Sequence, residues 1–188
     1  VSGTWTDYDA NNKPSFVHGD VVYARSIRAG LTSPGTTFIT ISITIAAPTF
    51  NLVRVNDATG TLTISAESGA TIYYKIDAAT DWSTYSKALT VSQHQTVQAY
   101  CNKLNKDSNT SSIVTDLVPN APSISISSVN GKVTITDNST ASYPSTLYYQ
   151  IGGTTGSWIE FTSSTNLVVN NGQVVYARAK RQNLYSSN

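Results

Sequence analysis

Val97-Gln98-Ala99-Tyr100 is one of three versions of the same short stretch in this chain of 188 residues. The other two are Val22-Tyr23-Ala24-Arg25 and Val175-Tyr176-Ala177-Arg178, at intervals of 75 and 78 residues from it. A tryptophan precedes each stretch by a nearly constant distance, and these tryptophans are Trp5, Trp82 and Trp158. Repetition at a fixed period is typical of arrays of small modules. We therefore expect several copies of one structural unit in tandem.

Apolar and hydroxyl residues alternate within each copy, as in Thr61-Leu62-Thr63-Ile64-Ser65 and Lys132-Val133-Thr134-Ile135-Thr136. A period of two predicts strands with one buried and one solvated face. Asn130-Gly131, between two such runs, predicts a hairpin turn. Short strands with turns every ~8–12 residues favour antiparallel β-sandwiches. No long segment carries the apolar stripe of a helix, so we expect an all-β fold without a substantial helix.

Two prolines at equivalent positions, Pro48 and Pro122, mark the start of modules, because proline suits the beginning of an edge strand. We expect one module at 47–119 and another at 120–188. Residues 1–46 contain only the back half of a module, from the tryptophan onward.

The last copy lacks a counterpart of Ile113-Val114-Thr115-Asp116-Leu117, which we interpret as the final strand of a module. Unpaired strand edges readily pair with other chains. We therefore expect the two ends of this chain to be completed by flanking sequence, or by a neighbouring copy or subunit that adds a strand.

Composition excludes several classes of partner. Charged residues make up 12% of the chain and the net charge is +1, which argues against nucleic-acid binding. The one basic concentration, Arg178, Lys180 and Arg181, is interpreted as a solvated strand end. No run of 18 apolar residues is present, so we expect no membrane insertion. Cys101 is the sole cysteine, which rules out an intrachain disulfide and predicts a small buried residue.

The alternation predicts which residues face the core: Ile72, Tyr74 and Ile76, and Val97, Ala99 and Cys101 with their counterparts Val22, Ala24 and Ser26. It also predicts which aromatic residues face outward, beside the three tryptophans. The outward tyrosines are Tyr23, Tyr73, Tyr100, Tyr148 and Tyr176. They could form a platform for sugar rings, or they could pack across strands beside Arg and Lys side chains. The tryptophans could mark a repeated ligand site or anchor a loop over the sandwich edge. We expect the packing roles, with glycan binding as the alternative.

The segment Ser68-Gly69-Ala70-Thr71-Ile72-Tyr73-Tyr74-Lys75-Ile76-Asp77, followed by Trp82 and Val97-Gln98-Ala99-Tyr100, resembles a known repeat. It is similar to the chitobiase/β-hexosaminidase C-terminal-type Ig-like module, a fibronectin III-like bacterial repeat. The resemblance implies tandem Ig-like sandwiches without catalytic residues. Such modules accompany glycoside hydrolases and occur in bacterial surface proteins and phage structural proteins.

No nucleophile elbow, zinc-protease motif or phosphate loop is present, so we expect no catalytic residue, no cofactor and no enzyme activity. Two acidic groups could hold calcium through carboxylate oxygens. They are Asp7, Asp9 and Asp20, and Asp77 and Asp81. The third copy keeps neither, so we interpret them as solvated turn residues and expect no metal site.

The function we expect is that of a stalk, fibre or assembly segment of a larger extracellular or cell-surface protein, or alternatively of a virion. The alternative function is a carbohydrate-binding or adhesion module beside a glycoside hydrolase.

Overall fold

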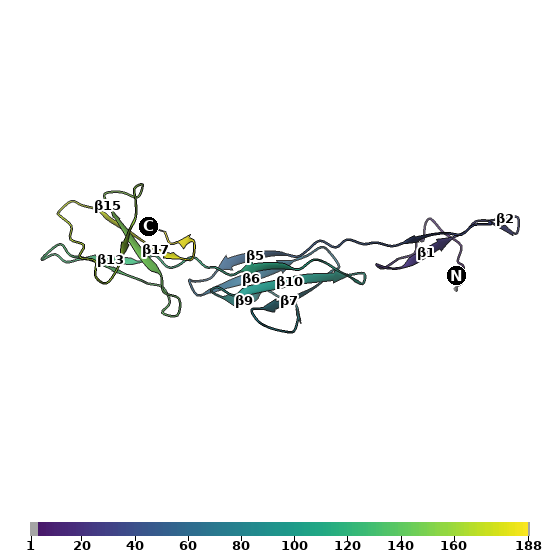
Figure 1. Ribbon diagram of the computed structural model, residues 1–188, viewed down its shortest axis with the longest axis horizontal. Coiled ribbons are helices and arrows are strands. Elements are labelled where there is room, and N and C mark those ends of the chain that lie inside the picture. The colour runs from purple at the N-terminus through teal and green to yellow at the C-terminus, as the bar shows by residue number, and fades with distance from the viewer. Residues whose placement is uncertain (1–3, 188) are drawn as a thin grey trace.

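The structure is a computed structural model that describes residues 4–187. Residues 1–3 and 188, which the predicted first and last modules include, lie outside that range. Every regular element among the described residues is a β-strand, so the predicted all-β fold is confirmed. Three groups of strands follow one another along the long axis of the molecule (Figure 1). We call them unit 1 (4–46), unit 2 (47–119) and unit 3 (120–187).

Unit 2 consists of two antiparallel sheets packed face to face. Its strands are β5 (Thr49–Arg54), β6 (Thr59–Ser65), β7 (Thr71–Ile76), β8 (Ser83–Thr84), β9 (Leu89–Ser92), β10 (Thr96–Lys103), β11 (Lys106–Asp107) and β12 (Ser111–Val114). One sheet has the order β5-β6-β9; in the other, β10 pairs with β7, β11 and β12, and β8 pairs with β7. Leu62, Ile64 and Val91 from the first sheet form a buried cluster with Val97 and Ala99 from the second.

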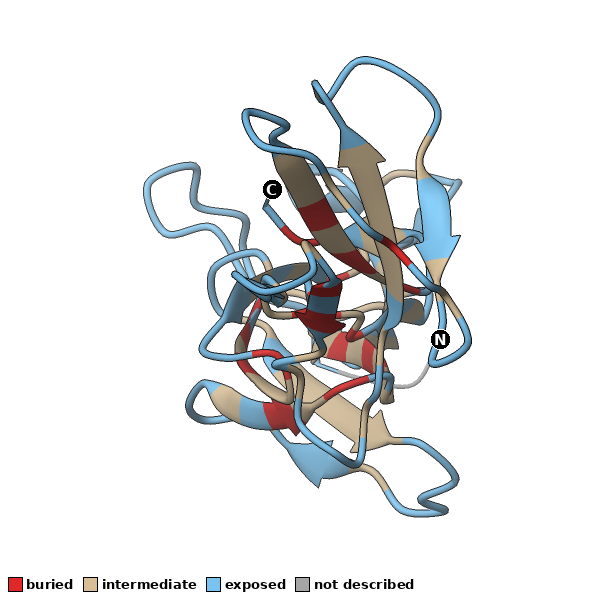
Figure 2. Ribbon diagram, turned by 90° about the vertical axis from the view of Figure 1, so that its left-hand side faces the viewer, coloured by how far each residue is buried: buried red, intermediate tan, exposed pale blue. Residues whose placement is uncertain are grey.

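The inward positions predicted for unit 2 are confirmed. Ile72, Tyr74 and Ile76 pack against the buried cluster. Ala99 and Cys101 are completely buried, as the alternation of β10 requires. Figure 2 shows the buried positions as bands along the strands, separated by more exposed positions.

Unit 3 repeats this arrangement with fewer strands. They are β13 (Ser123–Ile126), β14 (Val133–Thr136), β15 (Thr146–Ile151), β16 (Ile159–Phe161), β17 (Val175–Arg181) and β18 (Leu184–Tyr185). The predicted hairpin at Asn130-Gly131 joins β13 to β14. The other sheet has the order β16-β15-β17-β18. Within residues 120–187 no strand pairs with β17 where β12 pairs with β10.

Unit 1 contains two strand pairs, and no sheet packs face to face against them among its described residues. Its strands are β1 (Val21–Ala24), β2 (Ile27–Arg28), β3 (Leu31–Thr32) and β4 (Thr37–Thr40), with β1 paired to β4 and β2 to β3. The expected inward positions Val22, Ala24 and Ser26 are not buried: Val22 is half-buried, and Ala24 and Ser26 are exposed. That expectation is wrong here because no opposing sheet covers them.

In all three units a serine is hydrogen-bonded to the end of the strand that carries the repeated Val-x-Ala stretch. The backbone N–H of Ser26, Cys101 and Ala179 donates to the Oγ of Ser33, Ser108 and Ser186, at 3.2, 3.0 and 2.9 Å. The backbone N–H of each of these serines donates back to the carbonyl of the same strand residue, at 2.8, 2.8 and 2.9 Å. We call this arrangement the serine clamp. It satisfies backbone groups that would otherwise be left unpaired where the strand turns.

Replacing Ser186 by alanine should destabilise unit 3, because the Ala179 N–H would lose its acceptor in a buried site. Ser186 is buried, and loss of such a partner costs roughly 1–3 kcal/mol. Chemical denaturation monitored by hydrogen exchange of β17 measures the effect. Ser187→Ala, at the exposed neighbouring position, is the matched control and should be close to neutral. Equal stability of both variants would contradict a structural role for the clamp.

Candidate functional site

Each of the three tryptophans packs against a cationic side chain of its own unit. The Arg25 guanidinium lies 4.1 Å from the ring centroid of Trp5, and the Arg178 guanidinium lies 4.1 Å from that of Trp158. In unit 2 the Lys75 ammonium lies 5.0 Å from Trp82. Cation–π contacts of this length are attractive, so one face of each indole already has a partner within the molecule.

The outward tyrosines of unit 2 contact one another. Tyr73 and Tyr100 stack with ring centroids 5.1 Å apart, and Trp82 meets Tyr100 edge-on at 4.7 Å. Burial, and after it the charge of Asp107, raises the pKa of Tyr100 above its ordinary 10.0. The cluster therefore resembles a packed aromatic patch more than an open, flat platform.

The remaining outward tyrosines lie on other units and do not converge on this patch. Tyr23 packs against Phe38 at 5.7 Å in unit 1. Tyr148 lies across from Arg178, and Tyr176 across from Gln150, in the pairing of β15 with β17. The structure thus distributes the sequence-predicted aromatic residues over three separate surfaces.

Three of the five acidic residues considered as calcium ligands, Asp9, Asp20 and Asp77, accept hydrogen bonds from backbone N–H groups. Asp20 accepts from the Val17 N–H at 2.9 Å, and Asp77 accepts from the Thr96 N–H at 2.8 Å. Over residues 4–187, no three His, Cys, Asp or Glu side chains gather closely enough to hold a metal ion. The same part of the chain contains no helix long and apolar enough to cross a membrane.

A buried ion pair joins unit 2 to unit 3. Asp57, in the turn between β5 and β6, is 2% exposed, and Arg181, at the end of β17, is 8% exposed. Arg181 Nη2 lies 3.1 Å from Asp57 Oδ2, and its Nη1 donates to the Asp57 carbonyl at 2.6 Å. Arg181 Nη2 also donates to the Tyr143 carbonyl at 2.5 Å. Because this pair is excluded from solvent, removal of either residue would leave the charge of the other buried and uncompensated.

The Asp57 carboxylate also accepts hydrogen bonds from unit 3 and from residues 118–122, which we call the linker between units 2 and 3. Thr140 donates its backbone N–H at 2.7 Å and its hydroxyl at 3.0 Å, and the Asn120 amide donates at 3.1 Å. Arg54 of β5 holds the linker from the other side, donating to the Val118 carbonyl at 2.8 Å and to Asn120 at 2.7 Å. We call this set of contacts the 2–3 joint.

Acid should loosen the 2–3 joint. Burial alone would raise the pKa of Asp57, but hydrogen bonds from Thr140 and the adjacent Arg181 outweigh it, so the pKa lies below 3.8. A carboxyl with a depressed folded-state pKa stabilises the joint above its unfolded pKa, and that contribution is lost as the pH falls through the folded value. We expect proteolysis of the linker at 118–122 to accelerate below about pH 4. An Asp57→Asn variant should lose most of this pH dependence.

The solvated strand end predicted for Arg178, Lys180 and Arg181 is wrong for Arg181. The alternation that places Ala177 and Ala179 inward also places Arg181 inward, and this parity was the signal available in the sequence. Its partner could not be found by pattern, because Asp57 lies 124 residues away.

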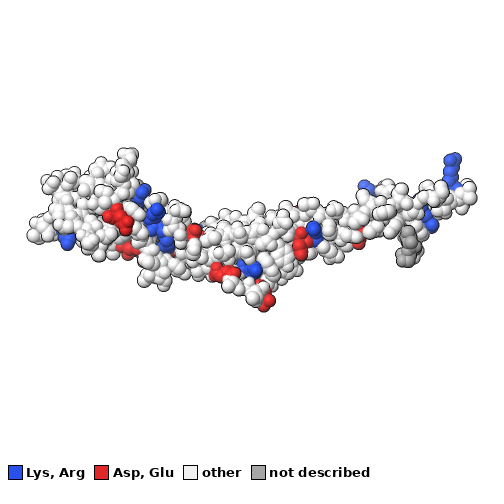
Figure 3. Space-filling model, viewed as in Figure 1, with Lys and Arg blue, Asp and Glu red and all other residues white. Residues whose placement is uncertain are grey.

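The contact between unit 1 and unit 2 is much sparser. The backbone N–H of His18 donates to the Leu104 carbonyl at 2.8 Å, and the Cys101 thiol lies 3.3 Å from the Ala46 carbonyl. Lys103 occupies the strand position that Arg181 has in unit 3, but it pairs with Glu67 of its own unit at 3.2 Å. We call these contacts the 1–2 joint. Figure 3 shows the charged side chains as few and scattered on the visible face.

Comparisons with protein-family models and with curated proteins find no match to this chain.

Proposed function

We propose that this chain is a non-catalytic spacer: a segment of stalk or fibre within a larger protein, built from tandem Ig-like units. The 2–3 joint carries this proposal. A buried charge pair with Thr140 and Asn120 around it fixes one sandwich end to end on the next. Such a contact supplies length and stiffness and provides no place for a reaction.

Two other observations support a spacer. The units follow one another along a single long axis (Figure 1). The aromatic and cationic side chains of the outer faces are engaged within their own units, as at Trp158 and Arg178. The resemblance of the sequence to bacterial Ig-like repeats supports the proposal that this spacer belongs to an extracellular or cell-surface protein, or to a phage particle.

Small-angle scattering of the full chain, with a panel of glycosidase and esterase substrates run in parallel, tests the proposal. We expect scattering from an elongated particle and no turnover of any substrate. A compact particle would contradict the spacer, and turnover that survives repurification would contradict the absence of catalysis.

Carbohydrate binding or adhesion is the second candidate, favoured by the partial exposure of the aromatic patch of unit 2. Trp82, Tyr73 and Tyr100 are half-buried and share one outer face. If this patch binds sugar rings, Trp82→Ala and Tyr73→Ala should each abolish binding on a glycan array. Tyr23→Ala, on unit 1, is the matched control and should leave binding unchanged. A glycan array without hits would remove this candidate.

A further inference from the structure

One edge of β1 in unit 1 has no strand against it among the described residues. β1 pairs with β4 alone. In the other units the corresponding strand is paired on this edge, β10 with β7 and β17 with β15. The register is the same in both cases, with Tyr74 opposite Ala99 and Tyr149 opposite Ala177. Ala24 is the counterpart of both alanines, since Ala24↔Thr37 reproduces Ala99↔Ser111.

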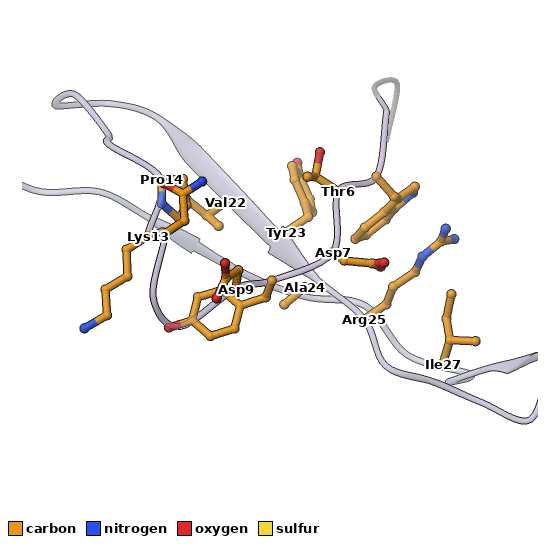
Figure 4. Close-up of a pocket in the computed structure, with 13 residues that line it drawn as sticks. Thr6, Asp7, Asp9, Lys13, Pro14, Val22, Tyr23, Ala24, Arg25 and Ile27 are labelled. Carbon is orange, nitrogen blue, oxygen red and sulfur yellow. The ribbon is translucent and has the colours of Figure 1, made fainter.

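A cavity of about 660 Å³ borders this free part of β1 (Figure 4). Val22 and Ala24 line it from the strand, and Tyr8 and Pro14 line it from the segment that crosses beside the strand. Val97, the counterpart of Val22, is completely buried in unit 2. The cavity therefore borders Val22 and Ala24, whose counterparts Val97 and Ala99 pair with β7 in unit 2.

Tyr8 supplies an independent observation. It follows Trp5 by three residues, as Tyr85 follows Trp82 and Phe161 follows Trp158. The ring of Tyr85 stands at 89° to Tyr74 with centroids 6.2 Å apart, and Phe161 stands at 89° to Tyr149 at 6.3 Å. Tyr8 is 74% exposed. Its two counterparts each pack against a tyrosine of β7 or of the equivalent strand β15. We call these two strands β7-type, and residues 4–46 contain no such strand.

We propose that unit 1 is an acceptor for a β-strand of the β7 type, which adds to β1 in antiparallel orientation. The shared register places a tyrosine of the incoming strand opposite Ala24, where its ring meets Tyr8. It places aliphatic residues opposite Val22 and Ser26, as Ile76 and Ile72 lie opposite Val97 and Cys101 in unit 2. Strands that add to a sheet edge gain affinity from main-chain hydrogen bonds and specificity from alternate side chains.

The partner is a further copy of the repeat whose β7-type strand is not already paired. A second folded copy of units 2 and 3 does not qualify, because β7 is held between β8 and β10, and β15 between β16 and β17. The chemistry that unit 1 recognises is the alternating pattern Thr-[Ile/Leu]-Tyr-Tyr-x-Ile shared by β7 and β15. This inference goes beyond the spacer role, and either can fail without the other.

A synthetic peptide with the sequence of residues 68–79, added to the full chain, tests the acceptor site. We expect hydrogen exchange at Val22–Arg25 to slow at least roughly tenfold when the peptide is bound, since a tenfold change requires only about 1.4 kcal/mol. The control peptide carries serine in place of the residues matching Ile72, Tyr74 and Ile76. No protection by the first peptide, or equal protection by both, would overturn the proposal.

A disulfide trap tests the register separately. Ala24→Cys is placed in a Cys101→Ala background, and the peptide carries cysteine at the position of either Tyr74 or Tyr73. Directly opposite Cβ atoms lie about 4.5–5.5 Å apart, within reach of a disulfide after small adjustments. We expect the Tyr74-position peptide to form the disulfide and the Tyr73-position peptide, which points to the other face, not to form it. Equal trapping of both peptides would overturn the register.

Discussion

Replacing Asp57 by alanine is expected to uncouple unit 3 from unit 2 while both units stay folded. The substitution leaves the Arg181 guanidinium buried beside two carbonyls, those of residue 57 and Tyr143, without a counter-charge. Removal of one partner of a buried ion pair costs roughly 3–5 kcal/mol. Because Asp57 lies in a turn outside the core cluster of unit 2, we expect the loss to fall on the joint.

Small-angle scattering and limited proteolysis measure this uncoupling. We expect a broader distribution of molecular shapes and faster cleavage within residues 118–122. Asp81→Ala removes an exposed carboxylate from a loop of the same unit and is the matched control. If the Asp57 and Asp81 variants behaved alike, the buried pair would have no part in holding the two units together.

Arg181→Met should be milder than Asp57→Ala. Without Arg181, the Asp57 carboxylate still accepts two hydrogen bonds from Thr140 and one from Asn120, so the remaining charge is solvated by fixed donors. Without Asp57, Arg181 keeps its charge and loses the one carboxylate that pairs with it among residues 4–187. If the joint depended only on packing, Arg181→Met, which removes the larger group, would be the more damaging substitution. A larger effect of Asp57→Ala would therefore show that the charge pair itself matters.

Leu62→Ala is expected to unfold unit 2 and leave unit 3 folded. Leu62 is completely buried at the centre of the cluster between the two sheets of unit 2. Truncation of a buried leucine to alanine costs roughly 2–5 kcal/mol. A unit of this size has a total stability of the same order, about 0.05–0.15 kcal/mol per residue. Unit 3 has its own cluster around Val133 and Ile135 and should keep its exchange protection.

Hydrogen exchange resolved by segment checks this result. Val53→Ala, which truncates a half-exposed apolar residue of β5 in the same sheet, is the control and should cost little. Simultaneous loss of protection in units 2 and 3 of the Leu62 variant would show that the two sandwiches unfold as one cooperative body.

The strands and their faces could be predicted from the sequence because both depend on a local signal. Alternation along Thr96–Lys103 determines which side chains of β10 face the core, and Asn130-Gly131 between two alternating runs predicts a turn. Unit 1 shows the limit of this reasoning. Ala24 and Ser26 carry the inward pattern, but a pattern cannot report whether an opposing sheet is present to bury them.

The 2–3 joint could not be predicted because it depends on groups brought together by tertiary structure. Asp57 belongs to a residue type common in turns, and Arg181 lay in what looked like a basic strand end. Their common role arises only because the fold buries both of them together. The serine clamp is predictable in part: the serine recurs in the sequence, but its backbone partners cannot be identified from the sequence.

The difference between the two joints has a mechanical consequence. Pulled at its ends, the molecule would extend first at the 1–2 joint, where the His18 backbone N–H and the Cys101 thiol make the contacts between units, before the junction that contains Asp57. Under tension, unit 1 would therefore separate from unit 2 first, and units 2 and 3 would keep their relative orientation.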